Sequence, residues 1–204
     1  MAVKYKQYVS SYNSVNRREY YQKSIFPESP SLFSDMWNSE KNKIPDDLSI
    51  VFRDLIFGSI PETVADILGK PRFVIENHGL SSLIFFYKER VNNHQVLVQV
   101  HFLGKEFFYA GYTFRDESNA ERKAIKKVLF EKYSVINSAL LERQDHLEDR
   151  DKNIISIRDS VNFNIIYLWG DDKIKNAVSQ NAYSLRFDKE REKRRKYDDL
   201  RSKL

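Results

Sequence analysis

Apolar residues recur with the period of an α-helix between residues 46 and 68. In residues 46–57 they have the i, i+3, i+4, i+7, i+8 spacing of an amphipathic helix. They are Leu48, Val51, Phe52, Leu55 and Ile56. Residues 60–68 repeat this pattern, with Ser59 as a favourable N-cap and Pro61 in the first turn. We therefore expect two consecutive helices in this region.

From residue 72 the period of the apolar positions changes to two, which is typical of β-strands. Four strands are predicted, at residues 72–77, 82–89, 94–103 and 106–115. Short, turn-like connections between them indicate an antiparallel meander. On the third strand, one face is expected to point into the core. It carries His94, Val96, Val98, Val100 and Phe102.

The second half of the chain predicts a helix followed by a hairpin. Ser118 and Glu121 have capping-box spacing, so a helix should begin there and run to about Tyr133. Its inward residues should be Ala124, Ile125, Val128 and Leu129. The apolar runs within residues 154–169 predict a hairpin that covers or extends the edge of the sheet. Residues 134–152 fit either a longer helix or a polar connection.

These elements together predict an α+β fold, in which an N-terminal helix pair packs on an antiparallel meander. An extra helix, a hairpin and a basic C-terminal helix complete it. Residues 1–30 should form a tyrosine-rich arm, either extended or as a short irregular helix, that docks on the body. Residues 31–187 should form a single domain, and residues 188–204 a basic C-terminal helix or tail.

The composition of the chain restricts its cellular location and the kinds of site it can form. The 204 residues include no cysteine, which excludes disulfides, thiolate zinc sites and a lipid-anchored cysteine. The N-terminal residues lack the apolar region of a secretory signal, and no run is long enough to span a membrane. We expect a cytoplasmic protein.

The net charge of +5 is concentrated at the two ends. Residues 1–23 hold five basic residues and one acidic residue, and residues 183–204 hold nine basic and five acidic residues. The tail supplies the candidate contacts to nucleic acid or another anionic surface. They are Lys189, Arg191, Lys193, Arg194, Arg195 and Lys196. The alternative is a solvated helix of alternating charges, which the interspersed glutamates favour.

Gly69-Lys70 has the residues of a phosphate-binding loop in the wrong context. Such a loop joins a strand to a following helix, whose amide end faces the phosphates. Here the pair follows a predicted helix, and Pro71 replaces the hydroxyl residue that would bind the metal. We interpret Gly69 as the helix-ending glycine.

No catalytic, metal or cofactor site is predicted. His94 and His101 are an odd number of residues apart, so a regular strand directs them to opposite faces. The acidic residues are expected to be solvated in polar connections. They are Asp145, Glu148, Asp149, Asp151, Asp171 and Asp172. The sequence also lacks a Gly-x-Ser-x-Gly elbow and a calcium-loop pattern.

Residues 48–115, 68 of 204, resemble small BamE/SmpA-type domains, which share the fold of β-lactamase inhibitor protein. The shared pattern is a Gly-led short helix, a Leu-Gly-x-Pro stop, an aromatic-rich strand and a strand that ends at a Gly-Lys turn. Matching positions are Gly58, Val64, Leu68, Gly69, Pro71, Phe86, Tyr87, Phe102 and Gly104. The resemblance implies a helix pair on a meander and a preference for protein partners. It does not imply outer-membrane assembly, because the signal and lipidated cysteine of envelope members are absent.

Three functional hypotheses follow. The first is a non-enzymatic protein-interaction or structural module, which predicts no ligand-sized polar pocket. The second is binding of nucleic acid or an anionic surface through the basic ends. The third is a hydrolase that uses the acidic segments near residues 145–151 or 171–172.

Overall fold

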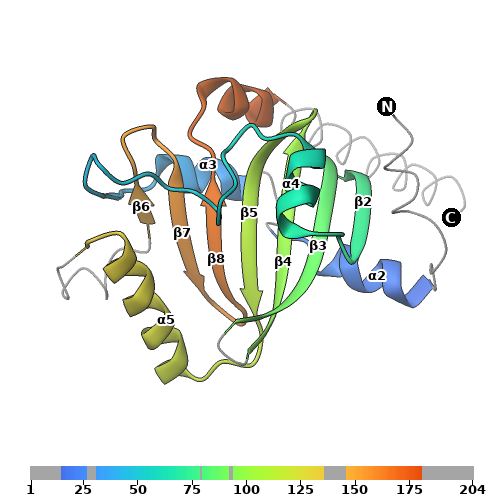
Figure 1. Cartoon of the computed structure of the whole chain (residues 1–204), viewed down its shortest axis with the longest axis horizontal. Helices are drawn as coiled ribbons and strands as arrows, with labels where there is room; N and C mark the ends of the chain where they lie inside the picture. Colours follow the sequence, from blue (N-terminus) through green and yellow to red (C-terminus); the bar gives the residue numbers. More distant parts are fainter. Residues whose placement is uncertain (1–14, 27–30, 79, 92–93, 136–145, 181–204) are drawn as a thin grey trace, which may run out of the picture.

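A computed structural model describes residues 15–26, 31–78, 80–91, 94–135 and 146–180, and these form an α+β fold around one eight-stranded sheet (Figure 1). The strand order is β1-β6-β7-β8-β5-β4-β3-β2, and only the β1–β6 pair is parallel. The strands are β1 (Asn42–Lys43), β2 (Phe73–His78), β3 (Ser81–Val91), β4 (His94–Leu103), β5 (Glu106–Phe114), β6 (His146–Glu148), β7 (Ile154–Asp159) and β8 (Phe163–Leu168). The helices are α2 (Val15–Lys23), α3 (Ser31–Asn38), α4 (Pro61–Leu68) and α5 (Asn119–Lys132), and residues 172–180 are also helical.

The predicted meander is confirmed, because β2 to β5 occupy the four predicted strand regions and pair in sequence order. The predicted hairpin is β7–β8, and it extends the sheet by pairing β8 with β5. The sheet is therefore larger than a simple meander, since β6 and β1 continue it beyond β7.

Both faces of the sheet are covered. Segment 44–60, α4 and α5 lie over one face, and α2 and α3 lie over the other (Figure 1). The even-numbered face of β4 lies in the core as predicted, with Val98, Val100 and Phe102 fully buried. On the odd-numbered face, Leu97, Gln99 and His101 are buried too, because α2, α3 and the helical residues 172–180 supply apolar side chains there.

The helix predicted over residues 46–57 is wrong, since this segment consists of turns and irregular chain. Of the five residues with helix-like spacing, only Phe52 and Leu55 are buried, and Ile56 is 71% exposed. Ile50, which lies outside that spacing, is buried as well. Local turns and distant groups bind the backbone instead. The Leu55 amide donates to the Phe52 carbonyl at 3.1 Å, and the Ile50 amide donates to the Asp149 carboxylate at 2.8 Å. Just after the segment, the Gly58 amide donates to the Phe107 carbonyl at 2.8 Å. Such bonds replace the i→i−4 ladder of a helix.

The second predicted helix is α4, but Ser59 is not its N-cap. The N-cap is Ile60, which makes no side-chain capping bond, while the Ser59 hydroxyl donates back to the Ile56 carbonyl at 2.6 Å. Pro61 occupies the first turn as predicted, and Gly69 ends the helix with φ 81°. This positive φ is a conformation that favours glycine.

Helix α5 begins at the predicted capping box, and two of its four predicted inward residues, Ile125 and Leu129, contact the core. Ala124 is exposed and Val128 is 66% exposed, whereas Leu129 and Phe130 are buried. Arg122 and Lys126, on the same side of the helix as Leu129, form ion pairs with Asp159 at the end of β7. These pairs fix a rotation of the helix that its apolar pattern alone does not predict.

The predicted docking of the arm is confirmed within its described residues. Tyr21 of α2 is 2% exposed and stacks on Phe73 with ring centroids 4.7 Å apart. Tyr5, Tyr8 and Tyr12 lie outside the described residues. Helix α3 contacts the other end of the same face, where the Trp37 indole donates to the Trp169 carbonyl at 3.1 Å. No helix within the described residues is long and apolar enough to cross a membrane.

Candidate functional site

The six tail residues predicted to contact anions, Lys189 to Lys196, lie outside the described residues, as does Asp145. The remaining acidic residues do not converge on one site. The Asp171 carboxylate accepts from the Lys173 and Ile174 amides at 2.7 and 3.2 Å, which caps the helical residues 172–180. Glu148 forms ion pairs with Lys41 and Lys43.

The expectation that the acidic segment near residue 150 is solvated is wrong for Asp149, which is 1% exposed. Its Oδ1 accepts from the Asp151 and Asn153 amides at 2.9 and 2.8 Å. Its Oδ2 accepts from the Ile50 amide at 2.8 Å and from Asn153 Nδ2 at 3.0 Å. Four donors organise the β6–β7 turn and tie segment 44–60 to it, so Asp149 has a structural role.

His94 and His101 lie on opposite faces of the sheet, as predicted. His94 Nδ1 is 3.7 Å from Glu117 and its Nε2 is 3.4 Å from Glu121. The two carboxylates therefore lie at different ring nitrogens, so a single ion could not bind all three side chains. Among the described residues, no group of three or more histidine, aspartate and glutamate side chains has the geometry of a metal site.

His101 forms a buried pair with a serine that sequence reasoning missed. Ser81 Oγ is 2.8 Å from His101 Nδ1, and the two residues are 4% and 2% exposed. A serine that acts as a nucleophile with histidine as its base must be accessible to the substrate, and the burial of both residues prevents such access. Gln99 lies beside the histidine and holds the chain after α2, accepting from the Phe26 amide at 3.0 Å and donating to the Ser24 carbonyl at 2.8 Å. Burial and these bonds favour a structural role.

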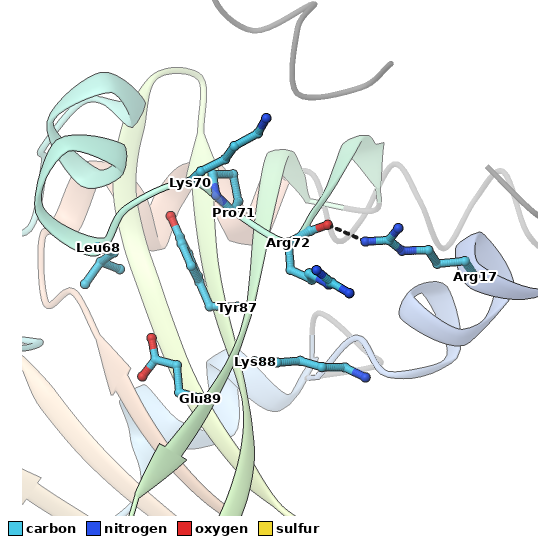
Figure 2. A pocket seen from close by; sticks show the side chains of 8 residues that line it. All are labelled: Arg17, Leu68, Lys70, Pro71, Arg72, Tyr87, Lys88 and Glu89. Atoms are coloured by element: carbon cyan, nitrogen blue, oxygen red, sulfur yellow. Dashed lines mark hydrogen bonds between the residues drawn. The ribbon is translucent and has the colours of Figure 1, made fainter. Parts of the chain in front are cut away.

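A basic cleft of about 500 Å³ lies where the α4–β2 connection passes β3 (Figure 2). Its charged lining residues are four basic side chains and one carboxylate: Arg17, Lys70, Arg72, Lys88 and Glu89. Leu68, Pro71 and Tyr87 supply its apolar wall, and Figure 2 shows Tyr87 pointing from β3 toward the 70–71 turn. The cleft is open to solvent rather than enclosed, so the expectation that no ligand-sized polar pocket exists stays a prediction.

A second cleft, of about 420 Å³, is adjacent, because Lys88 and Glu89 line both. Arg90 and Arg115 add two basic side chains and Asp116 adds a carboxylate. The two clefts together are lined by six basic and two acidic residues. We call this surface the basic edge cleft, and its basic residues are Arg17, Lys70, Arg72, Lys88, Arg90 and Arg115.

Helix α2 holds several of these side chains in place. Arg17 donates to the Arg72 carbonyl at 2.8 Å, the bond drawn in Figure 2. Lys88 Nζ lies 4.9 Å from the Tyr20 ring centroid and the Arg115 guanidinium carbon lies 5.1 Å from it. Such cation–π contacts restrain both side chains while leaving their charges available.

The acidic side chain shared by the two clefts already has a partner. Glu89 forms an ion pair with Arg53, whose Nε also donates to the Tyr112 hydroxyl at 3.1 Å. Burial raises the pKa of Tyr112, and Arg53 partly opposes this shift, so the phenol stays neutral at physiological pH. Because Arg53 offsets the charge of Glu89, the field of the cleft is basic.

Sequence reasoning missed the cleft because its basic residues come from separate segments. The sequence contained one indication of the cleft. The second predicted strand is longer than the first, so its end, which carries Lys88, extends beyond the first strand. Lys70 lines the cleft from the carbonyl end of α4, and not from the amide end of a phosphate-binding loop.

Comparison with known proteins identifies no relative: no family model, curated protein or solved structure matches the chain significantly.

Proposed function

We propose that this protein is a non-enzymatic binding module that recognises an acidic segment of another protein through the basic edge cleft. The observation that carries the proposal is the lining of that cleft by six basic and two acidic residues. One of the two acids, Glu89, is neutralised by Arg53. Complementary charge of this kind accelerates association and selects among partners.

Nucleic acid is the second candidate ligand, because basic clefts with aromatic residues also bind single strands. The contacts of the Tyr20 ring favour a protein partner. Its ring already contacts Lys88 and Arg115, so a stacking base would have to displace one of these cations. The apolar wall formed by Leu68, Pro71 and Tyr87 also suits a side chain better than a phosphate backbone.

A fluorescence anisotropy titration of the full chain tests the proposal. The probes are an acidic peptide of about ten residues, a basic peptide of the same length, and single-stranded DNA and RNA of similar length. We expect the acidic peptide to bind most tightly, with an affinity that falls as salt screens the cleft. Tighter binding of either oligonucleotide would transfer the proposal to nucleic acid, and absence of peptide binding would refute it.

Charge reversal locates the site. In the double variant Arg72→Glu/Lys88→Glu, both changes are at exposed positions, and we expect peptide affinity to fall about tenfold or more. Lys123→Glu and Lys127→Glu, combined on the exposed face of α5, give the same change in net charge away from the cleft. Equal losses in the two double variants would indicate a nonspecific effect of net charge.

A further inference from the structure

Strand β3 extends beyond its neighbour β2. The pairing of β2 with β3 ends at Phe73–Phe86, whereas β3 continues to Val91 and pairs with β4 as far as Val91–His94. Residues 87–91 therefore have a strand partner on one side only, among the described residues. Backbone N–H and C=O groups on such an edge are available to pair with another strand.

The basic edge cleft follows this edge. Three consecutive residues of β3, Tyr87 to Glu89, line its first part, and Lys88 to Arg90 line its second part. Side chains of consecutive strand residues point to opposite faces of a sheet. Consecutive residues can line one cleft only when the cleft runs along the edge of the strand. A ligand there contacts side chains from both faces of the sheet as well as the strand backbone.

We propose that an extended acidic segment of a partner protein adds to residues 87–91 of β3 as a further strand. This inference rests on the proposed function, and it specifies the binding mode. The added backbone would pair with the outer edge of β3, and its side chains would alternate between the two faces of the sheet.

The two faces of this edge differ in chemistry, which predicts the sequence pattern of the partner. Figure 2 shows Lys88 pointing to the side of β3 that carries Arg17. Arg90 is two residues further along the strand, so it shares this face. On the other face, Glu89 is paired with Arg53, and Tyr87 and Leu68 are apolar neighbours. The partner segment should therefore carry acidic residues at every second position and apolar or small residues between them.

Charge argues against the ends of this chain as the occupant. Residues 1–14 contain two lysines and no acidic residue, and residues 183–204 hold nine basic residues against five acidic ones. Both would bring like charge to a basic cleft, which disfavours association. A segment of a different, acidic protein is the occupant that complements the edge.

Backbone methylation of the probe peptide separates strand addition from charge attraction alone. The reference peptide alternates glutamate with valine or alanine over about ten residues. Two derivatives carry N-methyl groups either on all odd or on all even amides, so that one loses the donors facing β3 and the other loses the donors facing away. All three peptides have the same charge.

We expect one methylated peptide to bind about thirtyfold more weakly, and the other to stay within about threefold of the reference, because only one set of amides faces β3. Equal affinity of all three peptides would overturn strand addition while leaving acidic-segment binding intact. Equal, large losses in both derivatives would also overturn it, because strand pairing is one-sided. If even the reference peptide fails to bind, the proposed function itself fails.

Hydrogen exchange gives a second, independent readout on the full chain. With the reference peptide bound, exchange of amides within residues 87–91 should slow, and exchange in the β7–β8 hairpin should not change. A block peptide, with its glutamates contiguous and its valines and alanines contiguous, keeps the charge but loses the alternation. It should bind at least about fivefold more weakly, and equal affinity or unchanged exchange at residues 87–91 would contradict the proposed mode.

Discussion

Substitution of Asp149 tests whether one buried carboxylate holds segment 44–60 against the β6–β7 turn. The side chain accepts four hydrogen bonds, two at each oxygen, from donors at Ile50, Asp151 and Asn153. A hydrogen bond to a charged group contributes about 1.5–3 kcal/mol. Such contributions are not additive, so we expect Asp149→Ala to lower the free energy of unfolding by about 3–5 kcal/mol.

Two further variants make this expectation sharper. Asp149→Asn keeps one acceptor oxygen, and therefore one pair of bonds, so it should lose roughly half as much free energy as Asp149→Ala. Asp151→Ala removes an exposed carboxylate two residues away, whose Arg150 contact is 3.9 Å long, and should change stability by less than about 0.5 kcal/mol. Urea unfolding followed by circular dichroism measures all three variants. A loss below about 1 kcal/mol for Asp149→Ala would refute the structural role assigned to its four bonds.

Two other expectations concern stability. Gly104→Ala meets no atom within 4 Å but must adopt φ 62°, so it should cost about 1 kcal/mol. Gly58→Ala, at φ 85° with its new Cβ 3.2 Å from the Trp169 ring, should cost clearly more, and equal urea midpoints for the two variants would contradict this ranking. Burial raises the pKa of Asp159, but hydrogen bonds from Arg122 and a neighbouring lysine outweigh it and hold the pKa below 3.8. The lowered pKa gives stability that is present above pH 3.8 and lost as pH falls through the folded-state pKa, so Asp159→Asn should flatten the decline in urea midpoint between about pH 5 and pH 3.

The sequence predicts those elements whose structure follows from a local pattern of residues. Strands β2 to β5 and the β7–β8 hairpin follow from a period of two and short turns, and α5 follows from its capping box. Residues 46–57 were predicted wrongly, because their helix-like spacing belongs to an irregular segment. The Ile50 bond to Asp149 and the bond of the following Gly58 to Phe107 hold this segment, and both partners are far away in the chain. Local propensity cannot show such bonds.

The candidate site was still harder to predict. Its basic residues come from α2, the α4–β2 connection, the end of β3 and the residue that follows β5. Only the pairing of the strands brings these segments together, and pairing depends on register as well as composition. The unequal lengths of β2 and β3 are nevertheless present in the predicted strands, residues 72–77 and 82–89, and that inequality creates the open edge.

The bond between Trp37 and Trp169 has an optical consequence. These are the only two tryptophans in the sequence, and both pack in the apolar cluster between α3 and β8. Intrinsic tryptophan emission therefore reports the environment where α3 packs on β8, and strands β5 and β4 separate β8 from β3 (Figure 1). A ligand in the cleft should leave this emission unchanged, so a label on the ligand is the appropriate probe of binding. The same emission, compared with circular dichroism during unfolding, would show whether α3 separates from the sheet before the strands themselves come apart.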